Sequence, residues 1–438
     1  MNGTEPRLAC VQTLIRVVQA KSYGNLALDA ALKGLEARDV RLCKALFQGT
    51  LERMITLDAC IAAHASRPLA KFDLPVLCVL RCGIYELLYL HTPESAAVNL
   101  WTECVKKLRK TSAAGTVNAV LRGFLRGGKQ IPMPAEEAAA LSVAYSVPEE
   151  LVRQLLAEQN SETVSAFLED ALGEPPIYVR HNPLGCTEAQ LTERYALEAV
   201  PEIPGAFRAK QGFRTQLGTR TDDGQMPGEG WFHVQDLASQ LCCLALDAQP
   251  GETVLDVCAA PGGKTFTTAE RMQNKGRIYA YDLHENRVNL IRRGAKALGL
   301  QIVTAAAGDA RHTEKPAADR VLCDVPCSGY GVIRRKPEIR YKPLTETAGL
   351  PEIQYEILEA AAKAARPGGV LVYSTCTVLR RENEDVVRRF LAAHPEYHPE
   401  KPWQNIPALA EYAAEMTTLF PQMLGSDGFF ICKMRKEA

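Results

Sequence analysis

The chain has 438 residues, and its 51 basic and 51 acidic side chains give a formal net charge of zero. This length predicts two or three domains, and an apolar share of 47% is enough for real cores. Charged side chains interrupt both the first twenty residues and the most apolar stretch, 74–90, so we expect neither a secretory signal nor a membrane partner. Fourteen cysteines without a Cys-x-x-Cys pair, and eight unclustered histidines, indicate reduced thiols in a cytoplasmic protein that holds no metal.

Residues 1–130 carry a net charge of +8, against −11 for residues 131–250 and +3 for the remainder. A basic first domain on a neutral chain suggests a polyanionic partner, although a chance distribution of surface charge gives the same count. Apolar residues at i, i+3 and i+4 predict a compact helical bundle, with helices at 8–18, 26–35, 41–54, 76–90, 96–108 and 116–125. Basic side chains near its end either bind phosphates or line solvated helix faces: Lys106, Lys107, Arg109, Lys110, Arg122, Arg126 and Lys129.

Glycines at 127–128 and prolines at 132 and 134 mark a linker after this bundle. The next segment, 135–235, predicts a helical linker up to residue 172 and then a small acidic α/β module, with a strand at 177–180 and a helix at 187–195. We therefore expect domains at 1–130, 135–235 and 236–438.

Strand and helix patterns alternate from residue 250 onward. The predicted strands are 253–257, 277–281, 302–306, 320–324 and 370–373, and the predicted helices are 265–273, 285–299, 352–365 and 381–393. This alternation predicts a Rossmann-like, doubly wound parallel sheet, which binds its ligand at the carboxyl ends of the strands.

A glycine-rich loop, Cys258 to Thr265, joins the first of these strands to its helix. Two glycines let the backbone approach a ligand, and the helix start offers free N–H donors, although an ordinary tight connection uses the same residues. The spacing matches neither a Walker loop nor Gly-x-Gly-x-x-Gly, which disfavours a hydride-transferring dehydrogenase.

Three acids, Asp282, Asp309 and Asp324, follow later strands at the same predicted edge. One such acid is commonly a helix cap, but three beside a glycine-rich loop fit a nucleoside whose ribose and base amine need acceptors. Lys264 is the one basic residue beside the glycines, so a nucleoside without phosphates is favoured. S-adenosylmethionine is the common cofactor of this kind.

Cys327 and Cys376 each follow a strand in a polar turn, whereas Cys78, Cys82, Cys242 and Cys243 lie in apolar helical patterns typical of a core. A thiolate near a sulfonium methyl donor suggests nucleophilic catalysis. It suits methylation of carbon 5 of a pyrimidine, because thiolate addition at carbon 6 makes carbon 5 nucleophilic. Asp324 is placed to act as the acid near ring N3, and the second cysteine to aid elimination.

These motifs together resemble the RNA cytosine-C5 methyltransferase family (the Nol/Nop/Sun group). The residues that carry the resemblance are Asp256–Thr265, Asp282–Arg287, Asp324–Gly329 and Thr375-Cys376. In the first domain, Ala27–Asp29, Arg81–Leu87 and Val117–Arg122 resemble the NusB-type RNA-binding domain. The pairing implies an all-α first domain, a Rossmann-like catalytic domain, and methylation of a cytosine in small-subunit (16S) ribosomal RNA.

The resemblance also implies roles for individual residues. Cys376 is the nucleophile, Cys327 assists release of the product, and Asp324 completes the catalytic set. Thr377 stands where the family often has serine, which removes no reacting group. S-adenosylmethionine is held by Cys258, Ala259, Ala260, Pro261, Gly262, Gly263, Lys264, Asp282, Arg287, Asp309 and Asp324.

A basic run follows the Pro-Cys turn, and we expect it to hold RNA phosphates, although a solvated loop has the same composition: Arg334, Arg335, Lys336, Arg340 and Lys342. We expect a monomer. Two other functions stay open. One is an RNA-binding factor with an inert sheet domain, which the intact cysteines argue against. The other is an amino-directed or small-molecule methyltransferase. Amino-directed enzymes typically have Asn/Asp-Pro-Pro-aromatic where this chain has Asp324-Val325-Pro326-Cys327.

Overall fold

The computed structural model describes residues 3–20, 28, 31–217, 228 and 230–438. It divides into a helical unit, Met1–Gly173 with Ile333–Leu344, and a sheet unit, Glu174–Val332 with Thr345–Ala438. The boundary therefore falls inside the middle domain that we expected at 135–235. Its helices up to Gly173 belong to the helical unit, and its strands form a separate small sheet within the sheet unit.

The helical unit is built around α5, whose side chains are apolar on almost every side. Its buried Glu86 accepts hydrogen bonds from Arg7 and from the indole Nε1 of Trp101, the latter at 2.8 Å, which satisfies a carboxylate inside an apolar core. Within the predicted helix at 26–35, residues 26, 27, 29 and 30 lie outside the described residues. The helices are α1 (Thr4–Ala20), α3 (Ala37–Glu52), α4 (Met54–His64), α5 (Leu74–Tyr89), α6 (Glu94–Lys107), α7 (Ala114–Arg126), α8 (Glu137–Tyr145), α9 (Glu149–Glu158) and α10 (Ser161–Asp170).

The segment Ile333–Leu344 contains the 3-10 helix η4 (Pro337–Tyr341) and packs into the helical unit. The Arg340 guanidinium is fully buried and donates to the carbonyls of Glu52 and Ala171, both at 2.8 Å, and of Tyr145 at 3.3 Å. Arg334 is 7% exposed and forms a two-oxygen ion pair with Asp170.

Arg334 and Arg340 thus bind the protein itself, so the structure does not support the phosphate contacts that we expected for these two side chains. A buried guanidinium that satisfies several carbonyls is costly to withdraw. Lys336, by contrast, is exposed to solvent, and Arg335 and Lys342 are partly exposed.

The sheet unit begins with a small antiparallel sheet of order β2-β3-β1-β4. Its apolar face packs three aromatic rings, Tyr195, Phe213 and Phe232, with ring centroids 5.3–6.3 Å apart. The predicted strand at 177–180 and helix at 187–195 are confirmed. The elements are β1 (Tyr178–His181), α11 (Glu188–Arg194), β2 (Leu197–Ala199), β3 (Ala206–Ala209), α12 (Phe213–Gln216) and β4 (Phe232–Val234).

The large sheet has the order β10-β12-β9-β8-β5-β6-β7, and β11 pairs with β12. The five predicted strands are present and parallel to one another. The sheet as a whole is mixed, however, because β12 runs antiparallel to β9, and β10 and β11 run antiparallel to β12. The strands are β5 (Thr253–Asp256), β6 (Arg277–Asp282), β7 (Val303–Ala307), β8 (Ala318–Asp324), β9 (Ala365–Thr375), β10 (Tyr397–Glu400), β11 (Met416–Leu419) and β12 (Phe429–Lys436).

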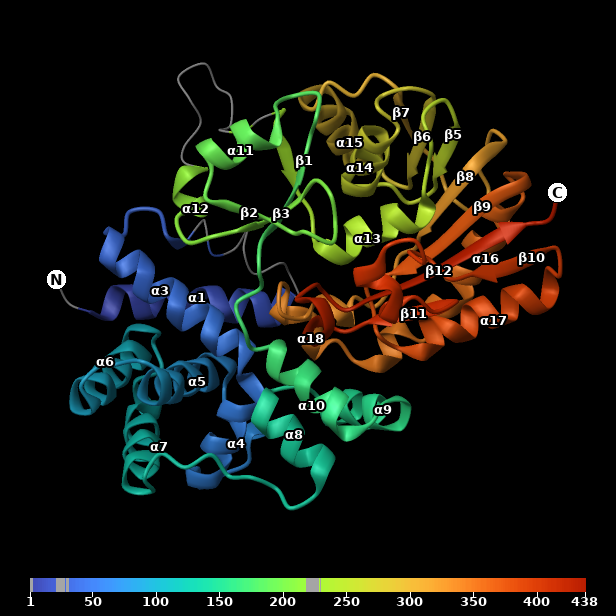
Figure 1. Ribbon diagram of the computed structural model, residues 1–438. Coiled ribbons are helices and arrows are strands. Elements are labelled where there is room, and N and C mark those ends of the chain that lie inside the picture. The colour runs from blue at the N-terminus through green and yellow to red at the C-terminus, as the bar shows by residue number, and fades with distance from the viewer. Residues whose placement is uncertain (1–2, 21–27, 29–30, 218–227, 229) are drawn as a thin grey trace. The chain divides into compact units, whose positions relative to one another are not determined.

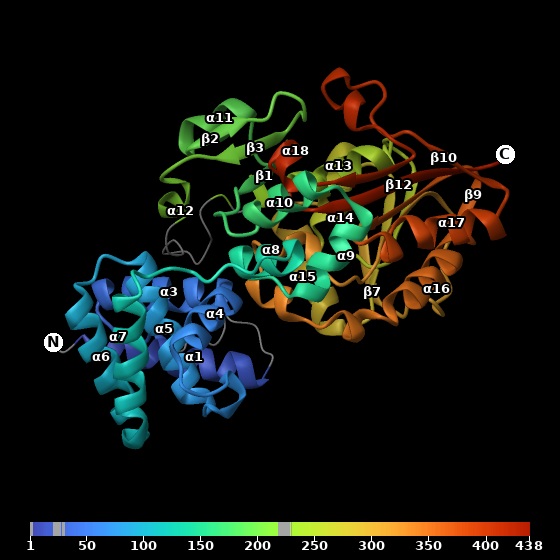
Figure 2. The ribbon, with the colours of Figure 1, turned by 90° about the horizontal axis from the view of Figure 1, so that it is seen from below.

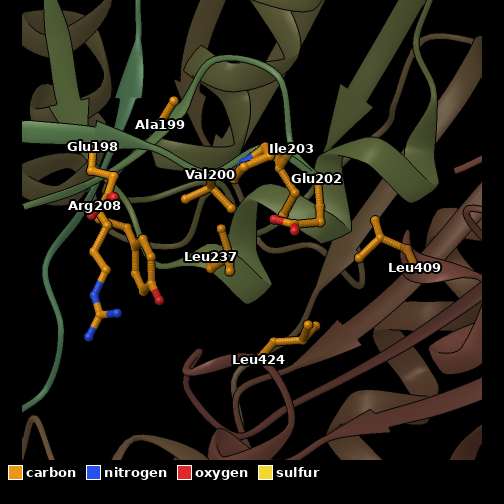
Figure 3. Close-up of a pocket in the computed structure, with 11 residues that line it drawn as sticks. Glu198, Ala199, Val200, Glu202, Ile203, Arg208, Leu237, Leu409 and Leu424 are labelled. Carbon is orange, nitrogen blue, oxygen red and sulfur yellow. The ribbon is translucent and has the colours of Figure 1, made fainter. Parts of the chain in front are cut away.

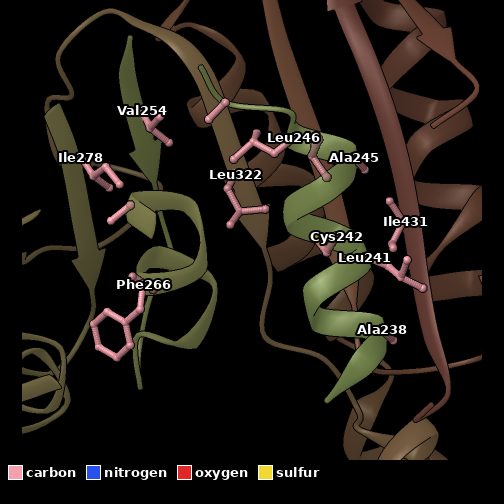
Figure 4. Close-up of a cluster of buried hydrophobic side chains, with 14 of the residues drawn as sticks. Ala238, Leu241, Cys242, Ala245, Leu246, Val254, Phe266, Ile278, Leu322 and Ile431 are labelled. Carbon is pink, nitrogen blue, oxygen red and sulfur yellow. The ribbon is translucent and has the colours of Figure 1, made fainter. Parts of the chain in front are cut away.

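Helices cover both faces of this sheet (Figures 1 and 2). Successive strand residues alternate between the two cores: Val254 and Leu322 meet α13 and α14 on one face, shown in Figure 4, while Leu255 faces the other. The remaining elements are α13 (Leu237–Leu246), α14 (Gly263–Arg271), α15 (Glu285–Ala297), η3 (Tyr330–Val332), η5 (Leu344–Thr347), α16 (Leu350–Ala362), η6 (Arg380–Glu382), α17 (Glu384–Ala393), η7 (Pro407–Tyr412) and α18 (Pro421–Leu424).

The strand order places the predicted site residues together. β5 lies between β6 and β8, and β9 follows β8, so the carboxyl ends of these strands share one edge. Asp324 is paired in register with Ser374, and the two cysteine turns begin directly after these positions.

Candidate active site

The loop after β5 is shaped for close approach by a ligand. Gly262 has φ +115°, and a Cβ there would lie 2.2 Å from the Phe266 ring, so the position requires glycine. Helix α14 begins at Gly263, which leaves its first N–H groups without intrahelical partners. The Arg287 guanidinium donates to the carbonyl of Ala260 at 2.9 Å and steadies the loop from the side.

Two acids stand at the neighbouring strand ends. Asp282 is the last residue of β6 and is 4% exposed; one of its oxygens accepts the His284 N–H at 3.2 Å, and the other lies 3.3 Å from Arg287. Asp309 follows β7, and a side-chain hydrogen bond from Arg311 lowers the pKa of its carboxyl to about 2. Both carboxylates are therefore held as acceptors.

Asp324, at the end of β8, lies between a cation and a hydroxyl. Its Oδ2 accepts from Lys264 Nζ at 2.8 Å, and its Oδ1 accepts from Ser374 Oγ at 2.8 Å. Burial alone would lower the pKa of Lys264, but the charge and hydrogen bond of Asp324, together with Cys242 and Cys243, outweigh it, and the pKa is raised overall. The ion pair links the glycine-rich loop to the cysteine edge.

Asp256 ends β5 beneath the loop and is 2% exposed. It accepts a hydrogen bond from Thr265 Oγ1 at 2.7 Å. Burial raises the pKa of this carboxyl from 3.8 to about 7, with Thr265 opposing the change. Asp256 therefore supports the loop from inside the protein.

Cys327 and Cys376 are not joined by a disulfide, and their Sγ atoms lie 3.3 Å apart. The hydrogen bond with Cys376, and then burial, raise the pKa of Cys327 well above the ordinary value of a thiol. The cysteines that we assigned to the core, Cys78, Cys82, Cys242 and Cys243, are buried. The structure thus brings together the two cysteines that the sequence singled out.

The sequence did not single out Glu382 and Asn383, which are fully buried and hydrogen-bonded to the residues beside both cysteines. They stand just before the acidic first turn of α17, where polar residues normally indicate an exposed helix start. In the sequence, the only indication of a role is that these two polar residues follow closely after the Cys376 turn. Helix-capping residues show the same local pattern, so the sequence alone does not distinguish the two roles.

A pocket of about 360 Å³ lies elsewhere in the sheet unit. Glu198, Ile203, Leu237, Leu409 and Leu424 are among its lining residues (Figure 3). None of the predicted site residues lines this pocket. We therefore identify the candidate site from the residues that meet at the carboxyl ends of the strands, and not from the pocket.

Comparisons with known proteins identify the family of this chain. A family model described as 16S rRNA methyltransferase RsmB/F matches residues 243–435, and the NusB family model matches residues 4–126. "Probable ribosomal RNA small subunit methyltransferase B" of Bacillus subtilis is 35% identical over 451 residues and covers 100% of both chains. The chain belongs to the RsmB/F methyltransferase family.

Further relatives support this membership. The "Ribosomal RNA small subunit methyltransferase B" of Pseudomonas syringae is 35% identical, with 88% of this chain and 86% of that protein covered. The crystal structure of PH0851 is similar along 100% of this chain and 99% of its own, with 25% identity and a TM-score of 0.77.

The cofactor of this RsmB/F methyltransferase is S-adenosylmethionine. The residues present fit it, because the carboxylates of Asp282 and Asp309 can accept from hydroxyl and amine donors, and the start of α14 offers N–H donors to a carboxylate. Among the described residues, His, Cys, Asp and Glu side chains form no group that could hold a metal, and no helix has the length and apolarity to span a bilayer.

Proposed function

We propose that this methyltransferase modifies carbon 5 of a cytosine in 16S ribosomal RNA through a covalent bond between Cys376 and carbon 6. The observation that carries the proposal is the pair of thiols 3.3 Å apart at the ends of β8 and β9, beside Asp324. S-adenosylmethionine supplies an electrophilic methyl group. Relatives named for small-subunit ribosomal RNA, and the NusB match, support the choice of substrate.

In this reaction the Cys376 thiolate adds to carbon 6 of the ring, and the electron pair of the C5–C6 double bond becomes available at carbon 5 for methylation. Asp324 faces N3, whose protonation favours the addition. After methylation the carbon-5 proton passes to a base, the C5–C6 double bond forms again, and Cys376 leaves as a thiolate. Cys327 assists this release, since its sulfur lies within hydrogen-bond distance of Cys376.

We further propose that the residues of the glycine-rich loop, with Asp282, Arg287, Asp309 and Asp324, bind the cofactor. The target base must leave its stack before Cys376 can reach carbon 6. Arg335 and Lys336 remain candidates for phosphate contacts beside the RNA.

An adduct assay tests the proposal. Wild type, Cys327→Ala and Cys376→Ala are each incubated with cofactor and unmodified ribosomal RNA and resolved on a denaturing gel. We expect Cys327→Ala to accumulate a covalent protein–RNA adduct and Cys376→Ala to form none. The reverse pattern would exchange the two roles, and the absence of both adduct and methyl transfer would refute the covalent reaction.

A further inference from the structure

Glu382 holds the backbone on both sides of Cys327. Its fully buried carboxylate accepts the Ser328 N–H at 2.8 Å and the Gln354 Nε2 amide at 2.9 Å. The same Gln354 amide donates to the carbonyl of Pro326 at 3.0 Å. The Glu382 carboxylate thus holds Ser328, which follows Cys327, directly. It holds Pro326, which precedes Cys327, through the Gln354 amide.

Asn383, the next residue, does the same for Cys376. Its Oδ1 accepts from Thr375 Oγ1 at 2.6 Å, and its Nδ2 donates to the carbonyl of Thr377 at 3.0 Å. Thr375, Thr377 and Asn383 are all fully buried, so water does not compete for these bonds.

The two turns are also tied to each other. Ser328 Oγ donates to Thr377 Oγ1 at 2.8 Å, and the Tyr373 hydroxyl donates to the Glu382 carbonyl at 2.6 Å, which anchors the pair to β9. Every contact lies within the sheet unit. A rearrangement of Glu382 would therefore act first on the Cys327 turn, and a rearrangement of Asn383 first on the Cys376 turn.

We propose that Glu382 and Asn383 are positioning residues that set the separation of the two reacting thiols, Glu382 acting through Cys327 and Asn383 through Cys376. This inference rests on the proposed function, because it presumes that the cysteines act in sequence. The charges of the two side chains match the two roles. A carboxylate beside the Cys327 turn favours the neutral thiol of the release group, whereas the amide of Asn383 brings no charge to the Cys376 turn.

The negative groups that face Cys327 are Cys376, Glu382 and Asp324, and the charge of each contributes to the raised pKa of Cys327. Removing the Glu382 charge while keeping an acceptor should therefore shift the pH profile of release and leave cofactor binding unchanged. A residue with only a structural role would alter stability without this shift.

The experiment separates adduct formation from adduct resolution in single-turnover reactions, with the full chain, cofactor and unmodified ribosomal RNA. We expect Glu382→Leu to slow resolution by about 100-fold with formation and KM values preserved, since small misplacements of a reacting group have effects of that size. Asn383→Leu slows formation by about 100-fold. Glu382→Gln, which keeps the acceptor, resolves the adduct within about tenfold of wild type and moves its pH profile to lower pH.

A double-mutant comparison decides the assignment. In the Cys327→Ala background, Glu382→Leu should slow resolution no further, because it acts through the missing thiol. A full additional loss there, or an unshifted pH profile for Glu382→Gln, would overturn the proposal; the second readout suffices if Glu382→Leu does not fold. Failure of the proposed function looks different, since Cys327→Ala alone would then form no adduct.

Discussion

Asp256 couples the stability of the sheet unit to pH. Its carboxyl ionises near pH 3.8 in an unfolded chain and near pH 7 when buried beneath the cofactor loop. Folding therefore takes up a proton between these values, and stability falls by about 1.4 kcal/mol for each pH unit as the pH rises through this window. The full penalty, roughly 4 kcal/mol, is present above pH 7 and absent below the unfolded pKa.

Asp256→Asn removes this ionisation and keeps an acceptor for Thr265. As the pH rises from 5 to 8, we expect the unfolding free energy of the variant to increase by about 3 kcal/mol relative to that of wild type. For a unit of this size, this corresponds to roughly 6–12 °C in unfolding temperature. Thermal unfolding of both proteins across this range measures the difference. Thr265→Val is the matched control and should lower the unfolding free energy where Asp256→Asn raises it. It removes the hydroxyl that donates to the Asp256 carboxylate, so the loss of stability is largest above pH 7. A difference between Asp256→Asn and wild type that does not change with pH would refute the reasoning.

Three other substitutions test the site and the corrected basic segment. Gly262→Ala should lower cofactor affinity at least tenfold in a calorimetric titration, because a Cβ at φ +115° meets a phenylalanine ring and costs about 1–3 kcal/mol in strain. Arg340→Met should destabilise the helical unit by about 2–4 kcal/mol in thermal unfolding, since it removes three buried hydrogen bonds, while the salt dependence of RNA binding stays unchanged. Lys336→Ala should instead weaken the salt dependence of RNA binding and leave stability nearly unchanged. We expect the slope of the logarithm of the binding constant against the logarithm of salt concentration (the salt slope) to fall in magnitude by about 1, and the unfolding free energy to stay within about 0.5 kcal/mol of wild type. If Arg340→Met lowers the salt slope, or Lys336→Ala leaves it intact, the assignment of these side chains is wrong.

The meeting of the candidate site residues at one sheet edge was predictable because it depends on local patterns and one topological rule. Each of Cys327, Cys376 and Asp324 follows a strand recognisable from its own apolar residues, and parallel strands end at a common edge. Once the alternation of strands and helices was recognised, the meeting of the two thiols required no further information.

Other features depend on partners distant in sequence. In the sequence, Arg340 lies among polar residues typical of a solvated loop. In the structure it is buried, because its guanidinium donates to the carbonyls of residues 52, 145 and 171, which are distant in sequence. The C-terminal strand Phe429–Lys436 was missed because no helix follows it to complete the alternating pattern. Glu382 and Asn383 were not predicted for the same reason. Their hydrogen-bond partners are Ser328 and Gln354 for Glu382, and Thr375 and Thr377 for Asn383.

The distance between the thiols limits how the proposed reaction can be arranged. Two thiolates 3.3 Å apart would repel strongly, so the pair loses its protons in separate steps and one sulfur holds a proton for the other. Asp324 and Glu382 both place negative charge near Cys327, which helps to raise the pKa of that thiol and favours Cys327 as the sulfur that keeps its proton in the proposed reaction. The same Glu382 carboxylate holds the Cys327 turn through Ser328 and Gln354, so its charge and its support act on the same cysteine. In the proposed reaction, the buried carboxylate that supports the Cys327 turn therefore favours Cys327 as the release group.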